Sequence, residues 1–294
     1  MKYIEKHPMI MIIIGILGIS LSAIFVRLSQ APSVVIAACR LLWTVLLLSP
    51  MVFGKRNSRK ELFSLSGKQV ILCVVSGVFL AIHFALWFES LKQTSVASST
   101  AIVCTEVVWV AVGYRLFMKG ITTKKAWICI ALALGGSFLI AFSDATGEGG
   151  HLYGDILSLL SAMAVAVYTL LGRAGRKTMT TTIYTYVVYL ACAITLILFT
   201  ALQQYSVDAF EPSAILVGFL LAVFSTILGH SIFSWCLKYF SPSFVSASKL
   251  CEPIVAAAVA AVLFREVPGV LQVIGGAIVI GGVFLYSRQE KNSQ

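Results

Sequence analysis

Stretches of roughly 20 apolar residues recur along almost the whole of this 294-residue chain. Each stretch is long enough to cross a hydrocarbon core of about 30 Å as a helix. Hydrophobic residues make up 59% of the chain and charged residues 12%, with a mean hydropathy of +0.94, outside the usual range of soluble domains. The pattern predicts an all-α integral membrane protein with ten transmembrane helices, at 8–28, 33–53, 69–90, 98–117, 126–143, 154–172, 183–202, 214–236, 244–264 and 269–287.

Charged residues are distributed unevenly between the predicted loops. With the N-terminus inside, the cytoplasmic loops hold most of the lysines and arginines, and the opposite loops carry mainly aspartate and glutamate. This positive-inside pattern predicts a multi-pass protein of the cell (plasma, or inner) membrane with cytoplasmic N- and C-termini. The formal net charge of +10 is thus a sign of topology, and no nucleic-acid partner is expected.

The second half of the chain repeats the first. The segment "LKQTSVASSTAIVCTEVVWVAVGYRLF" (91–117) aligns without gaps with "LKYFSPSFVSASKLCEPIVAAAVAAVL" (237–263). The halves 1–143 and 144–294 each hold five predicted helices, and an odd number of crossings inserts the second half inverted relative to the first. Inverted repeats are typical of secondary transporters. The repeat therefore predicts alternating access around a cavity at the membrane midplane.

Three segments carry a resemblance to a known family. They are "SAIFVRLSQAPSVVIAACRLLW" (22–43), "ALWFESLKQTSVASS" (85–99) and "SASKLCEPIVAAAVAAVLFREVPGVLQVIGGAIVIGGVFL" (246–285). They resemble the EamA-type family of the drug/metabolite transporter (DMT) superfamily, and the likeness covers essentially the whole chain. It implies ten helices in two halves around a central cavity, and export of amino acids or other small metabolites. The first half departs from the pattern, because Val107 stands where the second half has Pro253.

Ionisable residues within a hydrocarbon span cost about 2.5–3.5 kcal/mol each on insertion scales, and are expected to face a cavity or a partner. Glu106 and Glu252 occupy equivalent repeat positions near the midplane, where substrates and coupling ions bind in such folds. Both are predicted to bind substrate and to exchange protons during transport. The alternative is that each is permanently paired and only ties helices together. The charged residues and histidines predicted to lie deep in the hydrocarbon core, away from the ends of the spans, are Arg40, His83, Glu106, His230, Lys249 and Glu252.

The spacing of Lys249 and Glu252 allows an ion pair on one helix. The two charges of such a pair either neutralise each other permanently, or the substrate competes with one residue for binding to the other. Pro253 removes the helical donor for the carbonyl of residue 249, so the helix is expected to bend where it faces the cavity. Arg40 either meets a carboxylate of the substrate or pairs structurally with Glu106 or a helix end.

Three aromatic side chains and two histidines complete the candidate substrate site. His83 and Trp87 are one turn apart, and His230 lies at a nearly equivalent place in the second half, at an offset of 147. Both histidines are expected to line the cavity, although a membrane histidine can simply bond to a neighbouring helix. Tyr168 and Trp109 are candidates for aromatic walls around an amino-acid side chain, with packing against lipid or core as the alternative.

These features predict a secondary active transporter for small metabolites, in particular an exporter of amino acids or related compounds, with proton coupling as a hypothesis. Alternatives are export of drugs, amines, nucleotides or sugars, or a membrane-embedded enzyme. No nucleophile elbow, H-E-x-x-H or P-loop is found, and the seven cysteines show no C-x-x-C spacing. We therefore expect no enzymatic activity, no cofactor and no metal. The expected partners are a small-molecule substrate, the lipid bilayer and protons.

Overall fold

The computed structural model describes residues 8–94, 96–144, 152–255, 258–259 and 269–291. Within these ranges the chain is helical and contains no strand, which confirms the all-α prediction. The first half contains α2 (Pro8–Ser20), α3 (Ser22–Arg27), α4 (Ser33–Phe53), α5 (Arg56–Phe63), α6 (Gly67–Gln93), α7 (Val96–Val103), α8 (Glu106–Met118) and α9 (Lys124–Asp144). The second contains α10 (Leu152–Gly175), α11 (Thr181–Leu202), η1 (Val207–Ala209), α12 (Pro212–Leu220), η2 (Leu221–Ser231), α13 (Ile232–Cys236), α14 (Pro242–Ser248), η3 (Lys249–Cys251) and α16 (Val270–Lys291).

Seven helical segments in the described ranges are long and apolar enough to cross a membrane. They are Pro8–Arg27, Ser33–Phe53, Gly67–Gln93, Ser99–Met118, Leu152–Gly175, Thr181–Leu202 and Pro212–Cys236. The protein is therefore a multi-pass membrane protein, and each of these segments matches an expected span to within a few residues. The full set of ten stays a prediction. The expected spans 126–143 and 269–287 are not among these seven segments, and the expected span 244–264 includes residues 256, 257 and 260–264, which lie outside the described ranges.

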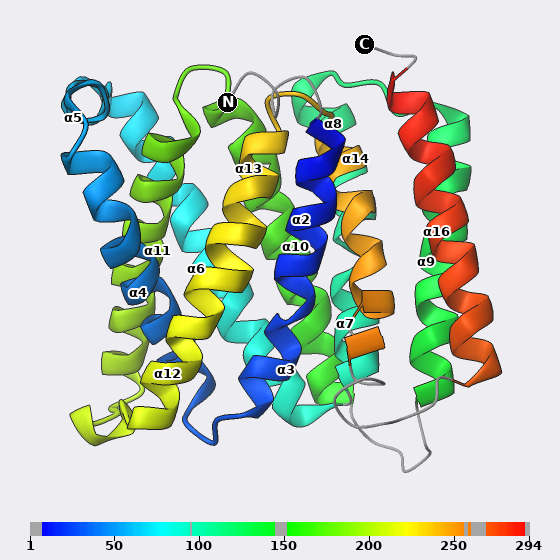
Figure 1. Cartoon of the computed structure of the whole chain (residues 1–294), viewed down its shortest axis with the longest axis horizontal. Helices are drawn as coiled ribbons and strands as arrows, with labels where there is room; N and C mark the ends of the chain where they lie inside the picture. Colours follow the sequence, from blue (N-terminus) through cyan, green and yellow to red (C-terminus); the bar gives the residue numbers. More distant parts are fainter. Residues whose placement is uncertain (1–7, 95, 145–151, 256–257, 260–268, 292–294) are drawn as a thin grey trace.

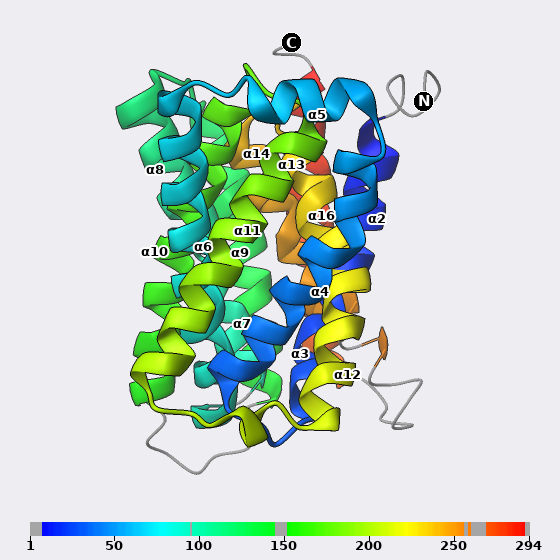
Figure 2. The same cartoon turned by 90° about the vertical axis from the view of Figure 1, so that its left-hand side faces the viewer.

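The long helices run roughly alongside one another and form a bundle (Figure 1). Helix α5 lies across one end of this bundle (Figure 2). The Glu61 carboxylate of α5 accepts hydrogen bonds from the Thr180 backbone N–H at 2.6 Å and from its hydroxyl at 2.8 Å. Thr180 is also the N-cap of α11, so one contact fixes the position of α5 and the start of a long helix.

The buried apolar residues form two clusters, and each cluster draws on both halves of the sequence. One contains residues of α4, α6, α10 and α11, and the other contains residues of α2, α8, α9, α14 and α16. Helix α9 packs against α16, α6 against α10, and α4 against α11. The halves 1–143 and 144–294 therefore interleave in space instead of packing as separate bodies.

Two helices are interrupted just before the equivalent glutamates. In the second half, the 3-10 turn η3 precedes Glu252. Pro253 has no N–H to donate to the Lys249 carbonyl, and the Glu252 N–H donates to it instead. In the first half, α7 ends at Val103 and α8 begins at Glu106. The interruption in the first half occurs without a proline. The break that Pro253 predicted for the second half is therefore present in both halves.

Segment η2 is a π-helix of 11 residues that the sequence pattern did not predict. Its Thr226 hydroxyl donates to the Leu221 carbonyl five residues earlier, at 3.2 Å. Wide turns of this kind are rare and are frequent at functional sites. Here the π-helix carries His230, one of the candidate site residues.

Helices α9 and α16 approach closely through small residues. A Cβ atom built on Gly136 would lie 2.6 Å from the Gly275 carbonyl oxygen, whereas one built on Gly135 would meet nothing within 4 Å. Small residues that let two backbones approach are a common basis of helix association in membranes.

Replacing Gly136 by alanine is expected to destabilise the protein by about 1–3 kcal/mol, because the added methyl group forces α9 away from α16. Gly135→Ala is the matched control on the neighbouring residue, and it should leave stability unchanged or raise it slightly, since alanine favours helix. Unfolding of both variants would be followed by circular dichroism in detergent. Equal stability of the two variants would contradict the close approach.

Candidate functional site

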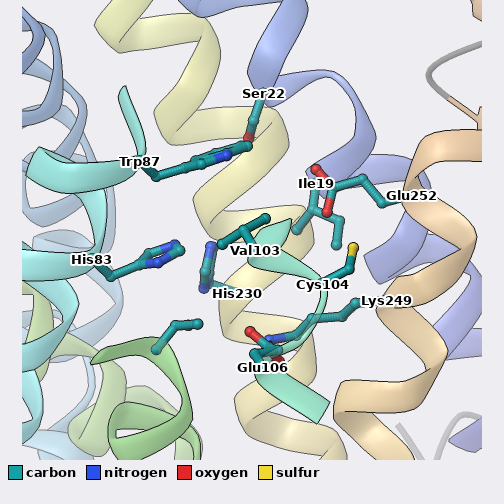
Figure 3. A pocket seen from close by; sticks show the side chains of 11 residues that line it. Ile19, Ser22, His83, Trp87, Val103, Cys104, Glu106, His230, Lys249 and Glu252 are labelled. Carbon is teal, nitrogen blue, oxygen red and sulfur yellow. The ribbon is translucent and has the colours of Figure 1, made fainter. Parts of the chain in front are cut away.

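A cavity lined by buried residues lies where the two apolar clusters meet, beside the two helix interruptions (Figure 3). Its walls come from α2, α3, α6, α7, α8, α10, η2 and η3, and thus from both halves of the chain. Six of the eight predicted substrate-site residues line it. The lining residues are Ile19, Ser22, His83, Trp87, Val103, Cys104, Glu106, Val165, His230, Lys249 and Glu252.

Lys249 and Glu106 form a buried ion pair in the cavity wall. Lys249 Nζ donates to Glu106 Oε1 at 2.8 Å, and both side chains are buried. Glu106 is the first residue of α8, where the helix N-terminus favours a negative charge. The same-helix pair that the spacing of Lys249 and Glu252 predicted is not formed, because α14 packs against α8 and brings Glu106 within reach.

Glu252 also lines the cavity, but its carboxylate is not paired. The side chain is 8% exposed, and it has no hydrogen-bond or ion-pair partner within the described part of the chain. Figure 3 shows it beside Ile19, on a different side of the cavity from the Lys249–Glu106 pair. The two equivalent glutamates therefore differ: Glu106 is neutralised by an ion pair, whereas Glu252 is available to bind a ligand.

The two candidate histidines come together from opposite halves, with ring centroids 6.3 Å apart. The His83 ring is nearly parallel to the Trp87 ring at 5.9 Å, and its Nδ1 lies 2.7 Å from the Ser161 hydroxyl. The Trp87 indole N–H has no partner in the described ranges. His83 thus hydrogen-bonds to a neighbouring helix and also lines the cavity. The two alternative roles considered for a membrane histidine are therefore both compatible with its position.

Two predicted site residues do not line the cavity. Tyr168 lies behind His230, with ring centroids 6.1 Å apart, and its hydroxyl is 3.0 Å from that of Ser234. Trp109 is 37% exposed on the outside of the bundle. Trp109 lies three residues after Glu106, which corresponds to a rotation of about 300° around the helix, so the two side chains point in different directions.

Arg40 is fully buried outside the cavity lining. Its Nε donates to the Thr226 hydroxyl in the π-helix at 2.7 Å, and its Cζ lies 4.1 Å from the centre of the Phe84 ring. Neither terminal nitrogen has a partner among the described residues. The alternative in which Arg40 pairs with Glu106 is not observed, and that glutamate is bound to Lys249 instead.

Five lining residues were missed by sequence reasoning, because apolar and small side chains in a membrane span carry no signal of their own. They are Ile19, Ser22, Val103, Cys104 and Val165. Cys104 could have been found, since it lies two residues before Glu106 at the helix interruption. Taken together, the cavity offers one free carboxylate, one neutralised ion pair, two imidazoles and an indole, which suit a small polar compound or a proton. No cluster of metal-ligating side chains occurs in the described ranges.

Comparisons with known proteins identify relatives of the chain. The family model described as the EamA-like transporter family matches twice, at residues 7–142 and 152–288. An uncharacterized transporter of Archaeoglobus fulgidus is 25% identical over 251 residues, covering 83% of this chain and 84% of that protein. The uncharacterized transporter YwfM of Bacillus subtilis is 24% identical over 228 residues, covering 76% of each.

The fold also matches that of a solved crystal structure. The TM-score is 0.79, and the match covers 98% of this chain and 99% of the other. Because only 15% of the residues are identical, this likeness bears on the fold alone.

Removing either residue of the buried Lys249–Glu106 pair should destabilise the protein, but by different amounts. Lys249→Met leaves Glu106 without a cation and is expected to cost about 3–5 kcal/mol. Glu106→Gln should cost less, because Lys249 can turn to Glu252 three residues away. The double variant should regain much of the loss. Unfolding in an SDS titration would measure all three, and additive losses in the double variant would contradict the pairing.

Proposed function

Since the chain belongs to the EamA-like transporter family, within the DMT superfamily, we propose that this membrane transporter is a secondary active exporter of amino acids or related small metabolites. The observation that carries the proposal is the cavity lined by charged and aromatic side chains from both halves of a membrane bundle. Charged groups in such a position are costly unless they serve a pathway or a partner. The family and its relatives are transporters, and the site contains no constellation typical of an enzyme.

The proposed mechanism is alternating access between two inverted five-helix repeats, 1–143 and 144–294. Three observations support it: the equivalent helix interruptions, the equivalent glutamates and the two matches of the family model. Because the halves interleave, the moving bodies in this mechanism are the two apolar clusters, each with helices from both repeats. The cavity lies where these clusters meet, so a small relative rotation would open it to either side.

Proton coupling is assigned to Glu252 alone. Both glutamates were candidates, but Glu106 is held by Lys249 at 2.8 Å, whereas Glu252 has no partner among the described residues. A carboxylate without a fixed counter-ion can exchange a proton or a ligand without first breaking a buried pair. The titratable groups that line the cavity with Glu252 are Lys249, Glu106, Cys104, His83 and His230, and Arg40 acts on it electrostatically from outside the lining.

We assign the protein to the cell (inner) membrane with both termini in the cytoplasm. Helix α2 begins, and α16 ends, at the same end of the bundle (Figure 1). That end also carries α5, with the exposed cations Lys55, Arg56, Arg59 and Lys60 at or just before it. An excess of lysine and arginine on one side is the usual mark of the cytoplasmic face.

In proteoliposomes, purified protein should exchange labelled amino acids by counterflow, and an imposed pH gradient should drive their accumulation. Glu252→Gln should abolish the response to the gradient, because the amide cannot carry the proton. Glu89→Gln, which removes a carboxylate outside the cavity, is the matched control and should behave as wild type. Flux that ignores the gradient would refute proton coupling, and no exchange of any amino acid would refute the proposed substrate class.

Access to the cavity can be tested at Cys104, with the other six cysteines replaced by alanine. A membrane-permeant maleimide should modify Cys104 more slowly when a transported compound is saturating, because the ligand covers the thiol. A variant that keeps only Cys129, which is buried outside the cavity lining, is the control. Labelling would be followed by intact-protein mass spectrometry. Equal rates at Cys104 with and without ligand would contradict the assigned binding site.

A further inference from the structure

The cavity lining carries one negative charge more than its positive charges can neutralise. Its carboxylates are Glu106 and Glu252, and its one cation among the described residues is Lys249. Because Lys249 is bound to Glu106, these two charges cancel locally. The carboxylate of Glu252 is left as the unpaired charge that faces a ligand.

Arg40 cannot take the place of a partner for Glu252. Its guanidinium is near enough to interact electrostatically with Glu252. However, it does not line the cavity, its Nε is bound to Thr226, and its flat face is covered by the Phe84 ring. Arg40 therefore offsets the charge of Glu252 from a distance and leaves the carboxylate oxygens open to a bound compound.

The cavity wall across from Glu252 suits the apolar part of an amine (Figure 3). Trp87 and His83 form a stacked pair of rings, and the Trp87 indole is enclosed in the cavity wall. Aromatic rings provide large apolar contact area for a hydrocarbon group. An amine with an apolar portion could therefore place its charge at Glu252 and its hydrocarbon against these rings.

We propose that Glu252 binds the ammonium group of the transported compound, and that this group, not a carboxylate, is the feature the site requires. The inference rests on the proposed transport function and narrows its substrate class to small compounds with a protonated amine. A carboxylate on the ligand finds no free cation, because the cation that lines the cavity is held by Glu106. Simple amines should therefore bind as well as the amino acids from which they differ by loss of that carboxylate.

Matched ligand trios test this requirement. Phenylalanine, phenethylamine and 3-phenylpropanoate share one side chain, as do leucine, 3-methylbutylamine and 4-methylpentanoate. Binding to the full-length protein in detergent would be measured by titration calorimetry, and competition by counterflow in proteoliposomes. In at least one trio, the amine should bind at least as tightly as the amino acid, and the acid without an amine should bind roughly 30-fold more weakly or not at all.

Variants then locate the interaction. Glu252→Gln should weaken amine binding by roughly 30-fold or more, whereas Glu89→Gln should not change it. Glu106→Gln should also weaken it, because the released Lys249 can neutralise Glu252. Removing that lysine as well, in Glu106→Gln/Lys249→Met, should restore affinity above that of the single variant. Melting temperatures would show that each variant is folded.

The possible results distinguish a failure of the ammonium requirement from a failure of the proposed transport function. Amino acids that bind while their amines do not would overturn the ammonium requirement and leave amino-acid transport standing. Unchanged amine binding by folded Glu252→Gln would overturn the role of this residue. Amines that bind while no amino acid is exchanged would support the inference and replace the proposed substrate class. No binding or exchange of any member of either trio would refute both.

Discussion

Burying Lys249 beside Glu106 requires the two interrupted helices that carry them to lie side by side. A lysine or a carboxylate alone in this position would cost several kcal/mol, and a buried pair is tolerated only when its geometry is good. The contact at 2.8 Å joins residues 143 positions apart, one in each half of the chain. It thereby fixes how α8 meets α14, sets one wall of the cavity, and leaves Glu252 as the carboxylate without a partner.

The interrupted helices show how a membrane bundle can accommodate polar backbone in its interior. At η3, the Glu252 N–H replaces the donor that Pro253 lacks, and in the first half a corresponding break precedes Glu106. The π-helix η2 is a third irregular segment at the same site, and its Thr226 binds Arg40. Irregular backbone is tolerated at membrane depth where protein covers it or where it lines a cavity.

The sequence was sufficient to predict features that depend on local composition. The span 33–53 coincides with α4, and the equivalence of Glu106 and Glu252 placed both in the cavity wall. Features that depend on which helices become neighbours could not be predicted. The partner of Lys249 depends on the approach of α8 to α14. Trp109 faces outward because of the rotation of α8, and no residue pattern distinguished the π-helix from an α-helix.

The interleaving of the two halves also has a consequence for biosynthesis. Helix α9 packs mainly against α16, which is synthesised only after α10 to α14. Until then, the small-residue face around Gly136 has no backbone partner to cover it and must rest against lipid or the insertion machinery. The first half therefore completes its tertiary packing only after helices of the second half have entered the membrane.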